Sequence, residues 1–134
     1  MNIAELAKRH TAAFVIAMLM IVFGLAEVAT SFNHEFFGLV TTTAVVTTVV
    51  GVILGLCYVV AGFLLATLRP RALTIAIVLL GVDVCGRVLM MVTGMYPMMS
   101  AKQSFGIIAG TAIAAAFAVF VCFKRRSLVA SATR

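Results

Sequence analysis

Charged residues are scarce in this sequence, and several residue types on which common functions depend are nearly absent. Only 10% of the 134 residues are charged, four of them acidic, and there are two histidines, three cysteines and no tryptophan. The cysteines stand singly at Cys57, Cys85 and Cys122, without the spacing of a redox pair or a metal site. We also find no HExxH motif and no serine nucleophile with a neighbouring base. We therefore expect no enzymatic activity, no cofactor and no metal.

Apolar residues dominate the composition of the sequence. They make up 64% of the chain, and the mean hydropathy is +1.24, whereas a soluble domain is roughly half apolar. A bilayer core needs roughly 20 apolar residues per helical span, and four such stretches lie at about 12–31, 39–68, 72–93 and 105–123. Residues 1–134 are thus predicted to form one domain, an all-α integral membrane bundle of four transmembrane helices in a lipid bilayer.

The limits of these spans carry further expectations. The second stretch is longer than a bilayer requires, so it is expected to tilt or bend. Pro70 cannot continue a helix, which predicts a tight basic turn between the second and third spans. The fourth is expected to stop before Lys124, followed by a frayed tail. The first resembles a signal peptide in its basic start, but Glu27 interrupts the cleavage zone, so we expect it to remain as a helix.

The basic residues predict the orientation. Lys102 is on one side of the predicted topology, and eight basic residues are on the other: Lys8, Arg9, Arg69, Arg71, Lys124, Arg125, Arg126 and Arg134. By the positive-inside rule both chain ends face the cytoplasm, in what we expect to be the plasma membrane. The basic residues stand in small groups at the ends of apolar stretches and form no continuous face, so the net charge of +6 does not indicate nucleic acid binding.

Three ionisable residues interrupt the predicted spans: Glu27, Asp83 and Arg87. A charge near the bilayer centre costs roughly 2.5–3.5 kcal/mol on insertion scales, so such residues usually pair inside the protein. Asp83 and Arg87 are four residues apart, on one helix face. Glu27 and Arg87 each lie about 22 Å above the starts of their spans. If these helices touch, Arg87 is predicted to join the two carboxylates in a triad of net charge minus one.

Two hypotheses of function follow from the triad. In the first, it binds an ion, a proton or a small polar solute in an oligomeric transporter or channel component, with Tyr58 and Thr48 lining the site and Asn33, His34 and Glu35 at its outer mouth. In the second, the charges are purely structural and only fix the helix register, in a non-catalytic membrane subunit or assembly factor.

Small residues at helical spacing predict where the helices pack, because close backbone approach drives association in lipid. The stripe on the first span is Ala13, Ala17, Met20, Gly24, Glu27 and Ser31, and that on the second is Ala44, Thr48, Gly51, Gly55, Tyr58 and Gly62. On the fourth, Gly106, Gly110 and Ala114 form a GxxxG stripe. Each stripe could serve packing within one chain or contact between chains, and the GxxxG stripe is the candidate homo-oligomer interface.

Overall fold

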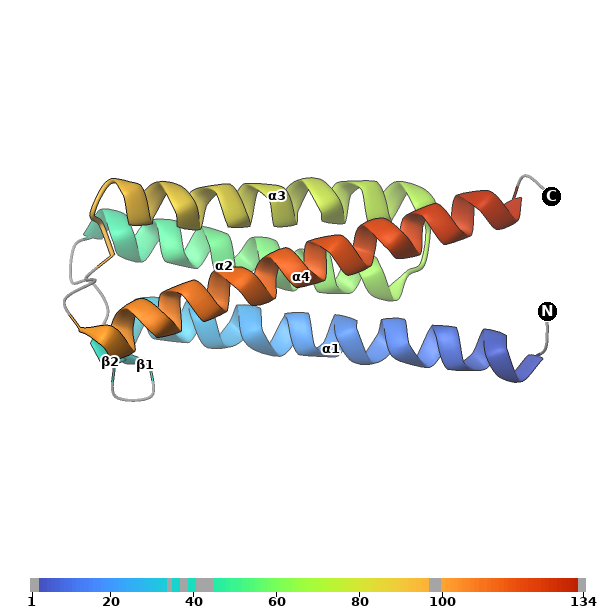
Figure 1. Ribbon diagram of the computed structural model, residues 1–134, viewed down its shortest axis with the longest axis horizontal. Helices are drawn as coiled ribbons and strands as arrows, with labels where there is room; N and C mark the ends of the chain where they lie inside the picture. The colour runs from blue at the N-terminus through green and yellow to red at the C-terminus, as the bar shows by residue number, and fades with distance from the viewer. Residues whose placement is uncertain (1–2, 34, 37–38, 41–44, 97–99, 133–134) are drawn as a thin grey trace.

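Four helices run side by side along one long axis in the structure, a computed structural model (Figure 1). The structure describes residues 3–33, 35–36, 39–40, 45–96 and 100–132. His34, Ala44 and Arg134, which were included in the predictions above, lie outside these residues, as does the side chain of Glu35. The elements are, in order, α1 (Ile3–Asn33), β1 (Glu35–Phe36), β2 (Leu39–Val40), α2 (Val45–Ala66), α3 (Pro70–Val92) and α4 (Ala101–Ala132).

Each helix is long and apolar enough to cross a membrane. The qualifying segments are His10–Asn33, Val45–Ala66, Pro70–Val92 and Ala101–Ala130. The shortest has 22 residues, above the roughly 20 that a bilayer core requires. The prediction of four apolar helices of spanning length is confirmed.

The predicted start of the second span is wrong. Leu39 and Val40 form β2, which pairs antiparallel with β1 through Glu35–Val40 and Phe36–Leu39, and α2 begins only at Val45. The chain must reverse direction between α1 and α2, so the apolar stretch cannot be helical along its whole length. Because the helix is shorter than predicted, its length requires no unusual tilt or bend.

The predicted end of the fourth helix is also wrong, because α4 continues through the basic residues to Ala132. Lys, Arg, Leu and Ala are all good helix formers, so the end of an apolar stretch need not end a helix. Arg125 Nε also donates a hydrogen bond to Thr74 Oγ1 of α3 at 2.9 Å, and Leu128 packs against the core. These contacts hold the predicted frayed tail in a helix as far as Ala132.

The two turns of the α2–α3–α4 segment follow local rules. Pro70 is the first residue of α3, as its missing N–H allows, and Leu68 adopts a φ of 52° in the turn before it. The predicted basic turn is confirmed.

Gly94, with a φ of 71°, lies just past the C-cap of α3. Ser100 Oγ then accepts a hydrogen bond from Gln103 N at 3.2 Å, so α4 starts earlier than predicted, at Ala101.

The α1–α2 pair packs through the two predicted small-residue stripes. A Cβ on Gly24 would lie 2.7 Å from the carbonyl oxygen of Gly55, and a Cβ on Gly62 would lie 2.8 Å from that of Ala17. Only glycine permits such a backbone approach. These stripes therefore serve packing within one chain.

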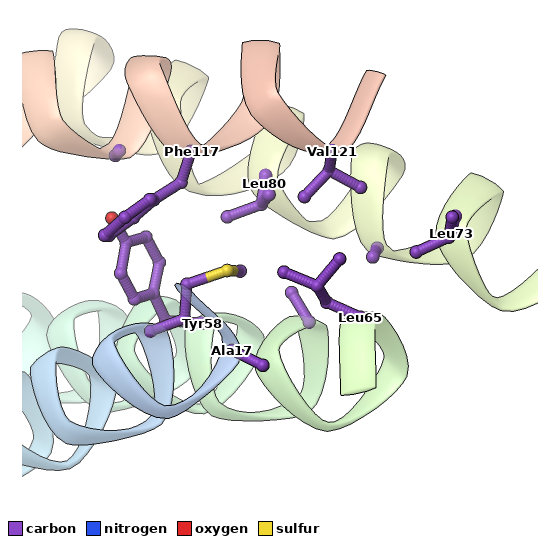
Figure 2. Close-up of a cluster of buried hydrophobic side chains, with 11 residues drawn as sticks. Ala17, Tyr58, Leu65, Leu73, Leu80, Phe117 and Val121 are labelled. Atoms are coloured by element: carbon purple, nitrogen blue, oxygen red, sulfur yellow. The ribbon is translucent and has the colours of Figure 1, made fainter. Parts of the chain in front are cut away.

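An apolar core fills the bundle on the side of the α2–α3 turn. Its buried members come from all four helices: Ala17, Met20, Tyr58, Ala61, Leu65, Leu73, Ala76, Leu80, Ala114, Phe117 and Val121. Figure 2 shows the rings of Tyr58 and Phe117 next to each other at one side of this core, in an edge-to-face arrangement with centroids 5.9 Å apart. In Figure 1, α4 crosses the bundle obliquely, and its last turns lie near the start of α3.

Candidate functional site

The three predicted intramembrane charges meet in one cluster, which we call the Arg87 cluster. Arg87 Nε donates to both carboxylate oxygens of Asp83, one turn earlier on α3, at 3.1 and 3.2 Å. Arg87 Nη2 forms an ion pair with Glu27 Oε2 of α1. The predicted triad therefore forms, with the guanidinium as the shared centre. Its charges sum to minus one when all three groups are ionised.

The three side chains differ in how much of them can be reached from outside the protein. The Asp83 side chain is 0% exposed, whereas that of Arg87 is 13% exposed and that of Glu27 is 17% exposed. Glu27 and Arg87 are thus the members of the cluster that are partly exposed, and Asp83 is enclosed behind Arg87.

Arg87 also contacts the two remaining helices. Its Cζ lies 6.0 Å from the ring centroid of Tyr58 on α2, within the range of a cation–π interaction. Its Nη1 lies 3.7 Å from the place that a Cβ on Gly110 of α4 would take. Nη1 makes no hydrogen bond within the described part of the chain. One side chain thus pairs with or lies near groups on all four helices, and the two N–H donors of Nη1 have no partner among the described residues.

Close helix contacts bring these groups together. Gly24, at the point of backbone approach, is one turn before Glu27, and its counterpart Gly55 is one turn before Tyr58. A bulkier residue at either position would push α1 away from α2. Glu27 of α1 and Tyr58 of α2 thus lie on either side of this contact, and both lie near Arg87 of α3.

Tyr96 is a neighbour of the cluster that the sequence did not reveal. It follows α3 and is half-buried. Burial raises its pKa, the Arg87 guanidinium opposes this rise, and the Glu27 and Asp83 carboxylates add to it. The charges of the Arg87 cluster therefore influence the Tyr96 hydroxyl, although the sequence suggested only a ring at the membrane boundary.

The other predicted lining residues are not among the contacts of Arg87. Thr48 is half-buried and lies ten residues before Tyr58, about 15 Å away along α2. Asn33 is exposed at the end of α1. Gly110 was missed, since the sequence indicated only a packing stripe there. Gly110 lies about 8 Å along its helix from Phe105, and Arg87 lies about 9 Å along its helix from Thr93. These similar depths were the signal in the sequence that could have placed Gly110 beside Arg87.

The GxxxG stripe of α4 faces mostly inward. Ala114 is 0% exposed within the apolar core, Gly110 faces Arg87, and Gly106 is exposed. A homo-oligomer through Gly106, Gly110 and Ala114 stays a prediction, with Gly106 as the accessible part of the stripe.

Comparison with family models, with curated proteins and with solved structures finds no match to this chain. Among the described residues, no group of three His, Cys, Asp or Glu side chains could hold a metal ion. The function must therefore be argued from the Arg87 cluster itself.

Proposed function

We propose that this chain is a multi-pass membrane protein that binds a proton or a monovalent cation at the Arg87 cluster and takes part in its transfer across the membrane. Its four helices span the bilayer, with both chain ends in the cytoplasm, and the plasma membrane is the proposed location. The Lys and Arg distribution supports the orientation.

The observation that carries the proposal is the unequal charge of the cluster. One guanidinium is shared by two carboxylates, one of them fully buried. An uncompensated charge in a low-dielectric interior is costly, so the cluster is stabilised by any single positive charge that joins it. A proton on Glu27 or a cation beside it supplies that charge, and both can reach the partly exposed side chain.

The position of the cluster in the bundle also supports transfer. The apolar core fills the half of the bundle next to the α2–α3 turn. The end of α3, which Tyr96 follows in the chain, and the β1–β2 pair lie at the opposite end (Figure 1). Entry is therefore proposed from the Tyr96 end. Four helices enclose little space, so the complete pathway is proposed to need more than one copy, in contact through the exposed part of the GxxxG stripe.

The test is an ion flux measurement in proteoliposomes with a pH-sensitive or cation-sensitive dye inside. The intact chain is expected to dissipate a proton, Na⁺ or K⁺ gradient faster than protein-free liposomes. Glu27→Gln should bring the rate down to that of protein-free liposomes because the charge imbalance is gone. Glu5→Gln is the matched control, since Glu5 lies on the same helix about 33 Å away and should keep the full rate.

A second variant leaves every charge in place. A leucine at position 110 would extend over Arg87 Nη1, whereas at Gly81 no other atom lies within 4 Å of an added Cβ. Gly110→Leu should therefore slow the flux, and Gly81→Leu should not. Full flux in Glu27→Gln, or no flux of any of the three ions in the intact chain, would contradict the proposal.

A second candidate function has its own observation, namely that two nitrogens of Arg87 are already occupied by carboxylates. Such a network can serve only to fix helix register in a membrane subunit or assembly factor. The triple variant Glu27→Gln, Asp83→Asn, Arg87→Gln removes all charge and keeps the side-chain shapes nearly unchanged. If the cluster is purely structural, this variant should stay folded and keep the activity of the intact chain. If the cluster is an ion site, the variant should stay folded but show no flux.

A further inference from the structure

We propose that a groove at the α2–α3 turn binds the headgroup of an anionic phospholipid. The groove has a volume of about 550 Å³ and is lined by Leu64, Arg69, Pro70, Arg71, Ala72 and Ile75. It lies outside the Arg87 cluster, at the other end of the bundle. The inference rests on the proposed insertion into a bilayer and not on cation binding by that cluster.

The lining of the groove has the two-part chemistry of a phospholipid. Arg69 and Arg71 supply guanidinium groups, which suit phosphate oxygens because their donors are arranged in a planar fork. Leu64 lies in the last turn of α2, and Ile75 lies one turn and a half into α3. Apolar lining therefore continues from the basic turn along both helices, as acyl chains continue from a headgroup.

The two arginines are available for such a ligand. Both are exposed, and neither forms an ion pair with another described residue. Glu27 and Asp83 belong to the Arg87 cluster, and Glu35 is on β1 at the opposite end, so Glu5 is the one acidic residue of the chain that belongs to this end. Within the described part of the chain, the groove therefore has an excess of positive charge that no carboxylate pairs with.

One further arginine is held at the same end. Arg125 Nε donates to Thr74 Oγ1 in the second turn of α3 at 2.9 Å, so Arg125 lies beside the start of α3. Basic pockets between helices at the membrane surface recognise anionic headgroups. Zwitterionic lipids carry a compensating charge and gain less here. The occupant we infer is therefore a lipid with a net negative headgroup, such as phosphatidylglycerol.

The test is native mass spectrometry of the delipidated full chain in detergent, titrated with phosphatidylglycerol or phosphatidylcholine of the same acyl chains. Phosphatidylglycerol should bind more tightly. Arg69→Gln and Arg71→Gln should each lower its affinity about fivefold. Arg126→Gln is the matched control, since Arg126 is exposed at the same end but does not line the groove, and it should leave the affinity unchanged.

A second pair of variants separates a built groove from general surface charge. Ile75 and Val78 are 54% and 60% exposed, so both tolerate a larger side chain, but only Ile75 lines the groove. Ile75→Trp should reduce phosphatidylglycerol binding, whereas Val78→Trp should not.

Three results would overturn the proposal. The first is equal binding of the two lipids by the intact chain. The second is an equal loss of phosphatidylglycerol affinity in Arg126→Gln and Arg69→Gln. The third is equal binding of phosphatidylglycerol by Ile75→Trp and the intact chain. Inorganic phosphate is added as a competitor of the lipid in the last part of the experiment. If it displaces the lipid at equal concentration, the groove binds phosphate generally and the commitment to a lipid fails.

Discussion

At the residue scale, Arg87 is the side chain on which the site depends. It pairs with carboxylates from α1 and α3, lies near the Tyr58 ring of α2, and faces Gly110 of α4. Lysine could not reproduce this arrangement, because a single ammonium lacks the fixed, spread donors of a guanidinium. The same residue that could serve binding therefore also holds the helices in register.

This double role predicts an order of stability among the variants. Arg87→Gln leaves two buried carboxylates unpaired and is expected to cost roughly 3–5 kcal/mol of unfolding free energy. Glu27→Gln should cost clearly less, because Arg87 keeps its bond to Asp83. Arg126→Gln, an exposed change, should stay within about 0.5 kcal/mol of the intact chain. Unfolding in detergent, followed by far-ultraviolet circular dichroism, measures all three. A loss in Glu27→Gln as large as that in Arg87→Gln would contradict the central role of the arginine.

At the element scale, the α1–α2 contact decides whether the site can form. The backbones meet at Gly24 and Gly55, one turn from Glu27 and Tyr58. The apolar core shared by the helices lies beside the cluster and includes Tyr58. A change in the separation of α1 and α2 is therefore expected to move Glu27 and Tyr58 relative to each other.

Two alanine substitutions test this contact. In Gly24→Ala the added Cβ would lie 2.7 Å from the Gly55 carbonyl oxygen, so the helices must separate, at an expected cost of about 1–3 kcal/mol. Gly81→Ala, on α3, has no other atom within 4 Å of the added Cβ and should be neutral or stabilising by up to about 1 kcal/mol, because alanine is the better helix former. Thermal unfolding in detergent compares them. Equal melting temperatures for the two variants would show that close approach at Gly24 is not needed.

At the scale of the whole molecule, the charges are distributed unevenly between the two ends of the bundle. The α2–α3 turn, the start of α1 and the last residues of α4 lie at one end, and β1, β2, the end of α3 and the start of α4 lie at the other (Figure 1). The basic residues Arg69, Arg71, Arg125 and Arg126 belong to the first end. A single orientation in the membrane, with this end in the cytoplasm, is expected from their number.

Cysteine labelling checks the orientation. The native residues Cys57, Cys85 and Cys122 are first replaced by serine, and a single cysteine is then placed at Ser100 or at Arg126. In intact cells a membrane-impermeant maleimide should label Ser100→Cys alone, and Arg126→Cys should react only after permeabilisation. The reverse pattern would invert the proposed topology, and labelling of both positions from outside would indicate insertion in both directions.

The cluster shows how far the sequence could predict the site. The pairing of Asp83 with Arg87 was predictable because residues four apart meet on one helix face. The pairing of Glu27 with Arg87 was predictable because the two residues lie at the same depth in their spans. Gly110 and Tyr96 were not identified, since their proximity depends on the oblique path of α4 and on the chain after α3. The start of α2 at Val45 and the end of α4 at Ala132 were missed because hydropathy measures an apolar run and not a helix end.

The sequence by itself determined the number of apolar helices and the charges that need a partner, because length, hydropathy and the cost of an isolated charge are local properties of the chain. Only the tertiary structure decided which groups surround Arg87, that the small-residue stripes of α1 and α2 pack against each other, and that Ala114 faces the core. These are choices between faces of helices that look equally apolar in sequence. They are settled by the simultaneous fit of all four helices, which no single segment contains.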